Sequence, residues 1–317
     1  MSQKKTYPYF SVVIPLYNKS KYILNTITSV LNQTFQDFEI IVVDDGSTDD
    51  GFEKVSKIKN PKITLYKQEN AGASVARNIG IEKSNSKYIA LLDADDFWHK
   101  NHLSELKRLI ERFPEAGLFC NNYEIKRNKN FITPASFNFK YSNDLMILKD
   151  FFKANIISFI PTSSSTAFLK TSFKKIGSYD TFLRTGQDID LWIRLALHYD
   201  VAFNPEVTMT YNNFDNTSLS KSNYNLDRYE LINKYEEEEL LNSSLKLYLD
   251  INRYALAIRC HLNDEYKLYQ KLKKEINYKN LNLKQKFLLL LPKPLLKQVK
   301  LFQKFLLKKK VYLTAYN

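Results

Sequence analysis

The chain has 317 residues, of which 44% are hydrophobic and 26% charged, a composition typical of a globular protein with a sizeable buried core. Its two cysteines, Cys120 and Cys260, lie far apart, which argues against a disulfide framework or a zinc site and fits a reducing compartment. No segment approaches the ~20 apolar residues that span a bilayer, and the start of the chain has no secretory signal pattern. We therefore expect a cytoplasmic protein.

The net charge of +13 is concentrated near the C-terminus. From Lys279 to Asn317 there are ten lysines and no acidic residue, so the preceding body is nearly neutral. Only nine of the 47 basic residues are arginine, the usual reader of guanine edges and phosphates. No nucleic-acid-binding motif accompanies the charge. We therefore expect no nucleic-acid partner.

The first hundred residues alternate between predicted strands and predicted helices. Apolar runs predict strands, and amphipathic periodicity predicts helices. In chain order the pattern gives a strand at 10–15, a helix at 22–33, a strand at 38–45, a helix at 49–59, a strand at 62–68, a helix at 73–84 and a strand at 88–93. This alternation with short loops predicts an α/β fold whose central sheet is mostly parallel and flanked by helices.

The remainder of the chain is less regular. The pattern favours a strand at 164–170, an amphipathic helix at 186–199 and short strands at 201–204 and 207–213, whereas 120–165 is hard to assign. From 226 to 276 the pattern is helical, and the glutamates at 236–239 are typical of a solvated helix face. We therefore expect an α/β domain over residues 1–225 and a helical C-terminal extension over 226–317.

Unusual residues follow three of the predicted strands. In a parallel sheet, ligands bind at the carboxyl ends of the strands. The residues at those ends are Pro15, Tyr17 and Asn18 after the first strand, Asp44 and Asp45 after the second, and Asp93, Asp95 and Asp96 after the fourth. Their shared position predicts one site at the sheet edge.

The motif LLDADD brings three carboxylates together directly after a buried strand. Asp93 and Asp95 alternate, so both side chains can point the same way in an extended loop. Clustered carboxylates suit a hard divalent cation such as Mg²⁺ or Mn²⁺, which keeps positions open for water and substrate phosphates. The alternative is a polar turn in which Asp95 or Asp96 caps the next helix.

Two further segments carry groups that suit a nucleotide. In VVDDGSTDD, Asp44 or Asp45 can accept from the N–H of a base or from ribose hydroxyls, or can belong only to a turn before a helix. In NAGASVARNIG, small residues open a helix whose N-terminus suits an anion, with Arg77 one turn further on. Arg77 then either neutralises a diphosphate or pairs with a core carboxylate.

The segment GQDIDLWIRLA places Asp188 at a helix start. Asp188 and Asp190 are two positions apart, so at most one of them faces a cleft. The helix macrodipole favours the ionised form of Asp188, which lies on the same face as Trp192. A carboxylate held ionised beside an aromatic wall suits a general base acting on an alcohol. The alternative for Asp188 is a plain helix cap.

Together these segments resemble family 2 of the glycosyltransferases, inverting enzymes with the GT-A fold. The resemblance covers residues 9–212 and rests on five pieces in order: SVVIPLYN, QTFQDFEIIVVDDGSTD, NAGASVARNIG, LLDADD and GQDIDLWIRLA. It implies that Asp93 and Asp95 form the D-x-D motif that holds a divalent metal on the donor diphosphate, and that Asp188 is the base. The residues that it implies for the nucleotide site are Pro15, Tyr17, Asp44, Asp45, Arg77 and Asp93.

The resemblance implies a function for the domain at 1–225: inverting, metal-dependent transfer of a single sugar from a nucleotide-sugar, most often a UDP-sugar, to a hydroxyl of a glycan acceptor. The Q/R-x-x-R-W motif and the membrane helices of processive synthases are absent. Gln187 stands where family members often carry Glu, which puts any acceptor contact of that Glu in doubt. An alternative is therefore a pseudo-transferase that acts as a membrane-bound scaffold.

The segment FLLLLPKPLLKQVKLFQKFLLKKKVYL at 287–313 predicts a basic amphipathic helix. After Pro294, the apolar side holds Leu295, Leu296, Val299, Phe302, Phe305 and Leu306, and the opposite side holds Lys297, Lys300, Lys304 and Lys308. This pattern favours a peripheral site on the inner face of the cell membrane, against anionic lipid. There the acceptor would be a lipid-linked glycan, as in bacterial surface polysaccharide synthesis. The alternative is a helix whose apolar side packs on the catalytic domain while its lysines are merely solvated.

Overall fold

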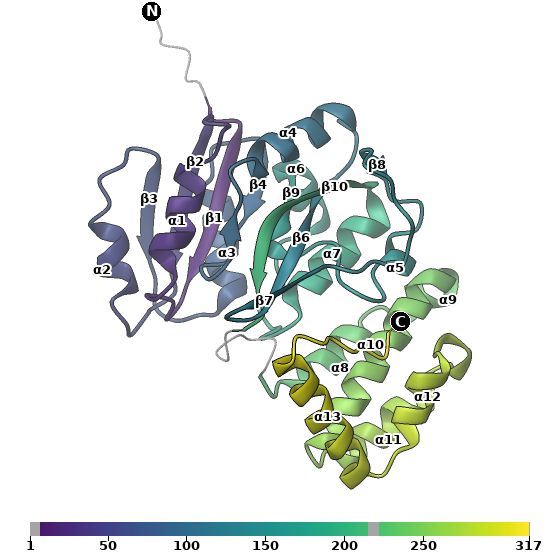
Figure 1. Ribbon diagram of the computed structural model, residues 1–317. Helices are drawn as coiled ribbons and strands as arrows, with labels where there is room; N and C mark the ends of the chain where they lie inside the picture. Colours follow the sequence, from purple (N-terminus) through teal and green to yellow (C-terminus); the bar gives the residue numbers. More distant parts are fainter. Residues whose placement is uncertain (1–6, 215–221, 317) are drawn as a thin grey trace, which may run out of the picture. The chain divides into compact units, whose positions relative to one another are not determined.

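The computed structural model describes residues 7–214 and 222–316, so the ends of the two expected ranges, at 1–6, 215–221 and 317, lie outside it. The described residues form two compact units. The first holds 7–135, 140–149 and 160–214, and the second holds 136–139, 150–159 and 222–316. Figure 1 shows the sheet of the first unit and the helices of the second.

The first half of the first unit follows the predicted alternation. Its elements are β1 (Phe10–Leu16), α1 (Ile23–Leu31), β2 (Phe38–Asp44), α2 (Gly51–Ser56), β3 (Ile63–Lys67), α3 (Ala73–Lys83) and β4 (Tyr88–Leu91). Strands β3, β2, β1 and β4 lie side by side and are parallel. β1, β2 and β4 are almost entirely buried, as expected for parallel strands covered on both faces. Their carboxyl ends therefore meet at one edge.

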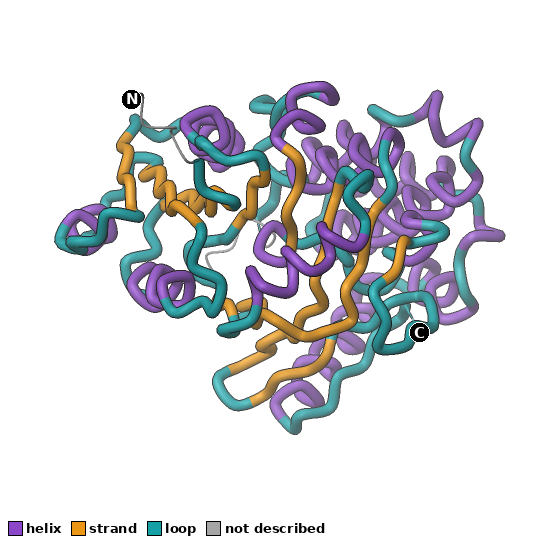
Figure 2. Tube along the Cα trace, turned by 90° about the horizontal axis from the view of Figure 1, so that it is seen from above, coloured by secondary structure: helices purple, strands orange, loops and turns teal. Residues whose placement is uncertain are grey.

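The second half of this unit extends the sheet with both antiparallel and parallel pairs. Its elements are β5 (Phe97–Trp98), α4 (His102–Arg112), β6 (Leu118–Asn128), β7 (Phe131–Pro134), β8 (Met146–Ile147), a 3₁₀ turn η1 (Ser163–Ser165), β9 (Thr166–Leu169), α6 (Lys170–Ile176), α7 (Gln187–His198) and β10 (Val201–Asn212). The strand order is β3-β2-β1-β4-β9-β6-β10-β5, and β9 runs antiparallel to both neighbours. Figure 2 shows the strands in orange and the helices in purple. The sheet is therefore mixed beyond β4.

One detail of the sequence-based prediction is wrong. The two short strands expected at 201–204 and 207–213 are a single strand, β10, whose pairing with β6 shifts register between Asn204 and Val207. Pro205 explains the interruption, because proline has no N–H to donate to the ladder.

A glycine sets how closely α3 packs on the sheet. A Cβ added at Gly80 would lie 2.4 Å from Cγ1 of Val13 on β1, so no larger residue fits without displacement. Ile41, Val43 and Ala76 pack at the same interface. This contact fixes the register of α3, and so the place where Arg77 meets the sheet edge.

The second unit is helical. It contains α5 (Phe151–Ala154), α8 (Asn225–Asn233), α9 (Glu236–Leu241), α10 (Ser243–Leu262), α11 (Tyr266–Glu275), η3 (Tyr278–Asn280), α12 (Leu283–Leu290) and α13 (Lys293–Lys308). The long helix α10 is central, because α5, α8, α9, α11, α12 and α13 all contact it. The helical pattern expected from 226 onward is present. The unit also takes in 136–139 and 150–159, which fall inside the range 1–225.

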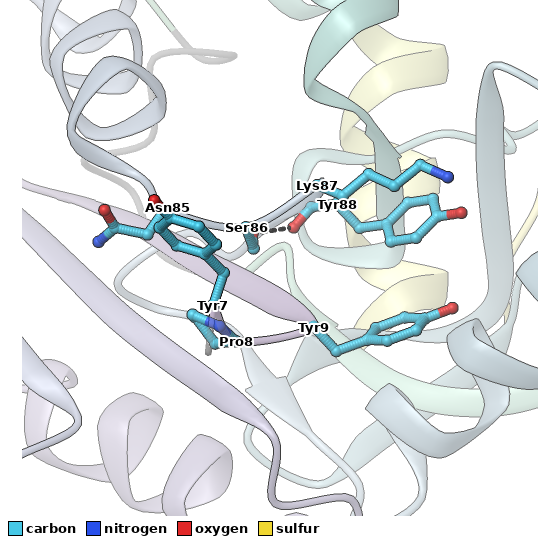
Figure 3. A pocket seen from close by; sticks show the side chains of 7 residues that line it. All are labelled: Tyr7, Pro8, Tyr9, Asn85, Ser86, Lys87 and Tyr88. Atoms are coloured by element: carbon cyan, nitrogen blue, oxygen red, sulfur yellow. Dashed lines mark hydrogen bonds between the residues drawn. The ribbon is translucent and has the colours of Figure 1, made fainter. Parts of the chain in front are cut away.

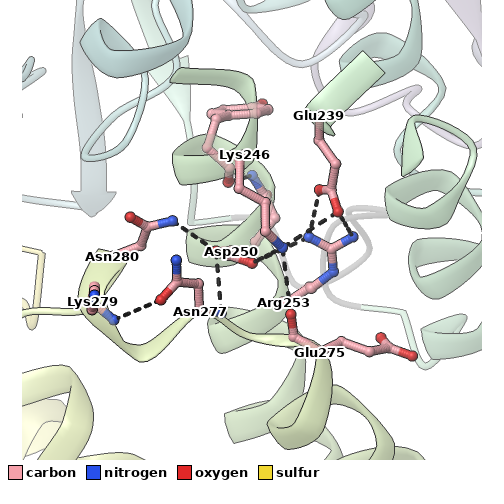
Figure 4. Close-up of polar contacts among 10 residues, drawn as sticks. Glu239, Lys246, Asp250, Arg253, Glu275, Asn277, Lys279 and Asn280 are labelled. Atoms are coloured by element: carbon pink, nitrogen blue, oxygen red, sulfur yellow. Dashed lines mark hydrogen bonds and ion pairs between the residues drawn. The ribbon is translucent and has the colours of Figure 1, made fainter. Parts of the chain in front are cut away.

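A buried ion-pair network lies against α10 (Figure 4). Arg253 donates to both oxygens of Glu239, at 2.7 and 3.0 Å, and to Oδ1 of Asp250 at 3.2 Å. Lys246 adds contacts to both carboxylates. The expectation that the glutamates at 236–239 form a solvated face is therefore wrong for Glu239, which is buried because Arg253 neutralises it.

The basic amphipathic helix expected in 287–313 is present as α13, but it buries only part of the expected apolar side. Leu296 is fully buried and Val299 and Leu306 are half-buried, whereas Phe302 and Phe305 are 57% and 54% exposed. Lys300, expected on the polar side, is half-buried, and burial lowers its pKa. The helix therefore packs on α10 and still presents aromatic side chains to solvent.

Candidate active site

The carboxyl ends of β1, β2 and β4 gather most of the predicted site residues at one edge of the sheet. Asp45 follows β2 and is buried. Its Oδ1 accepts from Gln68 Nε2 at 2.7 Å and from the Ala71 N–H at 2.8 Å, and its Oδ2 accepts from the Gly72 N–H at 2.9 Å. Asp45 thus holds the loop that leads into α3, where Gly72 has φ +93°. Among the described residues, the Asp45 carboxylate accepts its hydrogen bonds from this loop.

The other residues expected around a nucleotide lie beside this loop. Pro15 is half-buried in β1, and Tyr17, just beyond its end, is 46% exposed. Asp44 ends β2 fully buried; its Oδ2 accepts from the Ser47 N–H at 3.2 Å, while its Oδ1 has no hydrogen-bond partner among the described residues. A buried acceptor without a partner is costly, so Asp44 Oδ1 remains able to accept a hydrogen bond that the fold does not supply.

Arg77 joins two carboxylates from distant parts of the chain. Its Nη2 donates to Asp93 Oδ1 at 2.7 Å, and its Nη1 lies 3.6 Å from Asp188 Oδ1. Arg77 is almost fully buried. Burial by itself lowers the pKa of Arg77, but Asp188 and Asp93 outweigh it and raise the pKa above the ordinary value. The pairing of Arg77 with carboxylates that the sequence allows is therefore present, and its role at a diphosphate stays a prediction.

Asp188 lies in the first turn of α7, as the sequence predicts. Burial raises the pKa of Asp188 above its ordinary value; Arg77 acts against this shift and Asp93 adds to it. Oδ1 is buried, yet 31% of the side chain is exposed. The carboxylate therefore sits at the boundary between interior and solvent, where a raised pKa suits proton transfer near neutral pH.

Asp190 faces away from this site, as its spacing from Asp188 predicts. Its Oδ2 accepts from Arg194 Nε at 2.9 Å and from Nη2 at 2.6 Å, in the manner of an i,i+4 pair. Of the two aspartates that open α7, only Asp188 reaches Arg77.

The remaining acidic residues after β4 take different partners. Asp95 Oδ2 is 2.7 Å from Lys19 Nζ, on the loop after β1. Asp96 is buried, and burial raises its pKa well above the ordinary value, with Asp95 and Asp93 adding to the shift. Asp96 accepts from Ser164 Oγ at 2.5 Å and from the Asn212 N–H at 2.7 Å. The alternative of a helix cap is wrong, since β5 separates these residues from α4.

Lys19 is positioned by hydrogen bonds on both sides of it. Asn18, at φ +51°, donates its N–H to Ser47 Oγ at 3.1 Å and accepts from the Thr48 N–H at 2.7 Å. The N–H of Ser20 donates to Asp49 Oδ2 at 2.9 Å. These hydrogen bonds connect the loop after β1 to the loop after β2 and direct the Lys19 ammonium group to Asp95.

The carboxylates fit a divalent metal in donor type. Among the described residues, however, no three His, Cys, Asp or Glu side chains gather closely enough to hold an ion by themselves. Asp93 and Asp95 each carry a basic partner, Arg77 and Lys19. Magnesium sites often use one or two carboxylates and complete their shell with water and substrate phosphates, so Asp93 and Asp95 fit such a partial site.

The serines of η1 are functional candidates that sequence reasoning missed. Ser164 Oγ donates to Asp96 and accepts from the Asp93 N–H at 3.0 Å, so it braces the acidic turn. Ser163 faces Asp188 and acts to lower the pKa of that carboxyl. Their signal, three consecutive serines before a strand, is typical of any polar loop, so the sequence alone could not assign them.

An open hollow lies at the opposite end of β1 and β4. It is lined by Tyr7, Pro8, Tyr9, Asn85, Ser86, Lys87 and Tyr88 (Figure 3). Tyr9 and Tyr88 stack there with ring centres 5.1 Å apart. This is the amino end of the parallel strands, away from the carboxylates, so the hollow is not part of the candidate site.

Comparison with protein families agrees with this geometry. The family described as Glycosyl transferase family 2 matches residues 11–177, more than half of the chain. The chain is 32% identical over 187 residues to an uncharacterised glycosyltransferase of Rickettsia felis, covering 59% of this chain and 30% of that protein. It is 42% identical over 109 residues to a putative teichuronic acid biosynthesis glycosyltransferase, TuaG, of Bacillus subtilis, covering 33% and 43% of the two chains. The chain thus spans less than half the length of either relative.

Solved structures share the fold. The structure of residues 1–349 of S. aureus TarS in complex with UDP-GlcNAc superimposes with a TM-score of 0.65 at 15% identity, covering 86% of this chain and 82% of that one. The predicted GT-A fold, a central sheet flanked by helices with a helical C-terminal region, is therefore confirmed. The chain belongs to glycosyltransferase family 2.

Proposed function

We propose that the protein transfers a single sugar, with inversion, from a nucleoside diphosphate sugar to a hydroxyl group of a glycan acceptor in bacterial surface polysaccharide synthesis. The observation that carries this proposal is the convergence of Asp93, Arg77 and Asp188 at the carboxyl edge of the sheet. TarS was solved with UDP-GlcNAc and with UDP, which supports a UDP-sugar donor. The name of the Bacillus subtilis relative supports a surface polysaccharide as product.

In the proposed reaction, Asp188 accepts the proton of the acceptor hydroxyl. Its boundary position gives the hydroxyl access, and its raised pKa gives the carboxylate useful basicity. The oxygen attacks the anomeric carbon opposite the diphosphate, so the configuration inverts. Arg77 favours the ionised form of Asp188 before the transfer, because it offsets part of the cost of burial.

Donor binding is assigned to the loops after β1 and β2 and to the acidic turn after β4. We place the base and ribose beside Tyr17, Asp44 and Asp45, with Pro15 shaping the end of β1. Asp93 and Asp95 would hold Mg²⁺ or Mn²⁺, which when bound neutralises charge on the departing nucleoside diphosphate.

The test is Asp188→Asn with UDP-GlcNAc and Mn²⁺. We expect the rate of UDP release to fall by about 10²–10⁴, the usual contribution of a general base. The rise in melting temperature that the donor and metal cause should remain, because the substitution preserves shape. Asp200→Asn, at an exposed aspartate just beyond α7, is the matched control. Equal UDP release by Asp188→Asn and wild type would disprove the assignment of the base.

The same assay separates an enzyme from a catalytically impaired scaffold. Gln187 is buried at the start of α7 beside Asp188, where many family members carry Glu. Release of UDP by the wild-type protein excludes the scaffold. Donor-dependent stabilisation without any UDP release, across several UDP-sugars, would instead favour it.

We also propose that α12 and α13 place the protein on an anionic membrane surface, where a lipid-linked acceptor is available. None of the helices among the described residues is long and apolar enough to cross a membrane. Phe302 and Phe305 are exposed on α13, as are the lysines at 297, 304 and 308. Exposed aromatic residues beside lysines match an interfacial helix, and each lysine near the surface adds about 1 kcal/mol.

Flotation with phosphatidylglycerol vesicles tests the membrane proposal. The double variant Phe302→Ser/Phe305→Ser should lose most binding, and added salt should weaken what remains. Point variants are preferable to deleting 279–317, because Leu289 and Leu296 are buried and their loss would expose α10. Phe182→Ser is the control, at a phenylalanine that is 92% exposed in the first unit. Equal flotation of wild type and the double variant would rule out this surface.

A further inference from the structure

The loop between α6 and α7 is held in place by Arg194. This side chain donates to the three consecutive carbonyls at 176–178, from Nη1 at 3.0 and 2.7 Å and from Nη2 at 3.0 Å. Asp190 fixes the guanidinium group from the other side. The turn is therefore clamped to α7, and Tyr179 follows it directly.

A second clamp ties Tyr179 to α3. The Asn78 side chain donates to the Tyr179 carbonyl at 3.0 Å and accepts from the Tyr179 N–H at 3.0 Å. Asn78 is the neighbour of Arg77, so one turn of α3 positions both the arginine and the tyrosine. The Arg77 guanidinium carbon lies 5.5 Å from the centre of the Tyr179 ring. The backbone of Tyr179 is thus fixed relative to Arg77 and α7.

The Tyr179 ring and the Asp188 carboxylate both lie against the Arg77 guanidinium, and Tyr179 and Ser163 of η1 both influence that carboxylate. The two residues are only 1% and 3% exposed. Both hydroxyls act to lower the pKa of the Asp188 carboxyl. Burial raises the pKa of Tyr179 well above its ordinary value, so the phenol stays protonated and can donate.

In this conformation neither hydroxyl makes a hydrogen bond of good geometry to Asp188. Tyr179 Oη, Ser163 Oγ and Asp188 Oδ1 are all buried and have no partner of good geometry among the described residues. A buried polar atom without a partner costs about 1–3 kcal/mol, and native structures retain few of them. Two such hydroxyls beside a carboxylate oxygen that also lacks a partner mark a group that completes its hydrogen bonds in another state of the site.

We propose that Tyr179 and Ser163 are positioning residues that orient the Asp188 carboxylate when the acceptor hydroxyl engages it. A small rotation of the carboxylate would bring both donors into hydrogen-bond geometry and turn the other oxygen toward the acceptor. Neither hydroxyl gives up or takes up a proton in the reaction. Arg77 and Asp93 are the other charged groups that face Asp188, and they remain in place. This inference rests on the role of Asp188 proposed above.

The test compares Tyr179→Phe and Ser163→Ala with wild type, using UDP-GlcNAc, Mn²⁺ and water as acceptor. We expect kcat for UDP release to fall by about tenfold to a hundredfold in Tyr179→Phe, since orienting partners typically contribute that much, while KM for the donor stays unchanged. Ser163→Ala should show the same pattern. Tyr88→Phe is the control, because Tyr88 is also a buried tyrosine but lies at the opposite end of β4 (Figure 3).

Each outcome decides the question. If wild type releases UDP and both variants keep its kcat, the positioning role is wrong while the proposed function stands. A rise in KM with unchanged kcat would assign Tyr179 to donor binding and would also overturn the inference. If wild type neither binds nor cleaves any UDP-sugar, the proposed function falls and the inference falls with it. Melting temperatures show whether Tyr179→Phe is folded. If Tyr179→Phe is not folded, the kcat of Ser163→Ala decides the question.

Discussion

Replacing Arg253 by alanine should destabilise the helical unit. Arg253 lies in the middle of α10, only 2% exposed, and is the common partner of Glu239 and Asp250. Its removal leaves two carboxylates inside the unit without their main positive charge (Figure 4). Breaking a buried ion pair by removing one partner typically costs about 3–5 kcal/mol, because the remaining charge is desolvated and unpaired.

The surrounding contacts place the cost near the lower end of that range. Lys246 Nζ remains 2.8 Å from Asp250 Oδ1 and 3.3 Å from Glu239 Oε1, so part of the negative charge stays compensated. Asp250 Oδ2 also keeps its bond from Asn280 Nδ2 at 2.8 Å. We therefore expect a loss of about 3 kcal/mol, which corresponds to a fall of about 2 M in the urea midpoint for a typical slope of about 1.5 kcal/mol per M.

The two tryptophans allow the two units to be followed separately. Trp98 and Trp192 both lie in the first unit, so fluorescence reports on that unit, whereas circular dichroism at 222 nm also reports on the helices of the second. The midpoint measured by circular dichroism should fall in Arg253→Ala. The midpoint of Arg253→Lys should fall less, since lysine keeps the charge but cannot make the bidentate contact with Glu239.

The control is Lys293→Ala, which removes the partner of the exposed Asp264 in the same unit. An exposed pair contributes little, so its midpoint should stay close to that of wild type. If Arg253→Ala unfolds at the same urea concentration as Lys293→Ala, the network does not stabilise the unit and the reasoning from buried charge is refuted. A matching shift in fluorescence would show that the two units unfold together.

Two further predictions concern the first unit. His102 is fully buried against Trp98, with ring centres 4.2 Å apart, and burial lowers its pKa to about 3. The stability that neutral His102 contributes is therefore complete above the unfolded pKa of about 6.5, and it is lost below that pH by about 1.4 kcal/mol per pH unit. Between pH 7.5 and 5.5 the melting temperature should fall less in His102→Gln than in wild type, and an equal fall would contradict this. Gly80→Ala should lower stability by about 1–3 kcal/mol, because the new methyl group overlaps Val13; an unchanged melting temperature would show that α3 shifts freely.

The first half of the sheet could be predicted from the sequence because each element there carries a local signal. The apolar runs of β1, β2 and β4 are continuous, and polar residues follow each of them, such as Asp45 after β2 and Asp93 after β4. The pairing of β9 and the extent of β10 were harder to predict. β9 is short, and its antiparallel pairing depends on β6, whose sequence mixes apolar and polar residues. β10 was expected as two strands, on either side of Pro205 and Glu206.

The convergence of carboxylates could be predicted, but not their partners. That Asp45 and Asp93 lie at one site follows from the shared edge of the parallel strands, whereas the place of Asp188 beside them was implied by the family resemblance. That Arg77 lies between Asp93 and Asp188, and that Lys19 reaches Asp95, depends on loop conformations such as the positive φ of Asn18. Asp45 was predicted to face a nucleotide, and only the structure reveals that it also holds the loop at 68–72. That nucleotide role stays a prediction.

Several like charges at the end of a buried strand need compensation, and in this fold the protein supplies it. Asp93 is paired with Arg77, Asp95 with Lys19, and Asp96 is buried under conditions that favour its neutral form. The acidic turn can therefore form as part of folding, without depending on a divalent ion for its stability. An incoming cation must then compete with two basic side chains, whereas a cation that arrives with a diphosphate brings an anion to which those side chains can turn. For the metal and donor sites proposed above, this charge balance would favour joint binding, and it would make the same two cations available to the departing diphosphate.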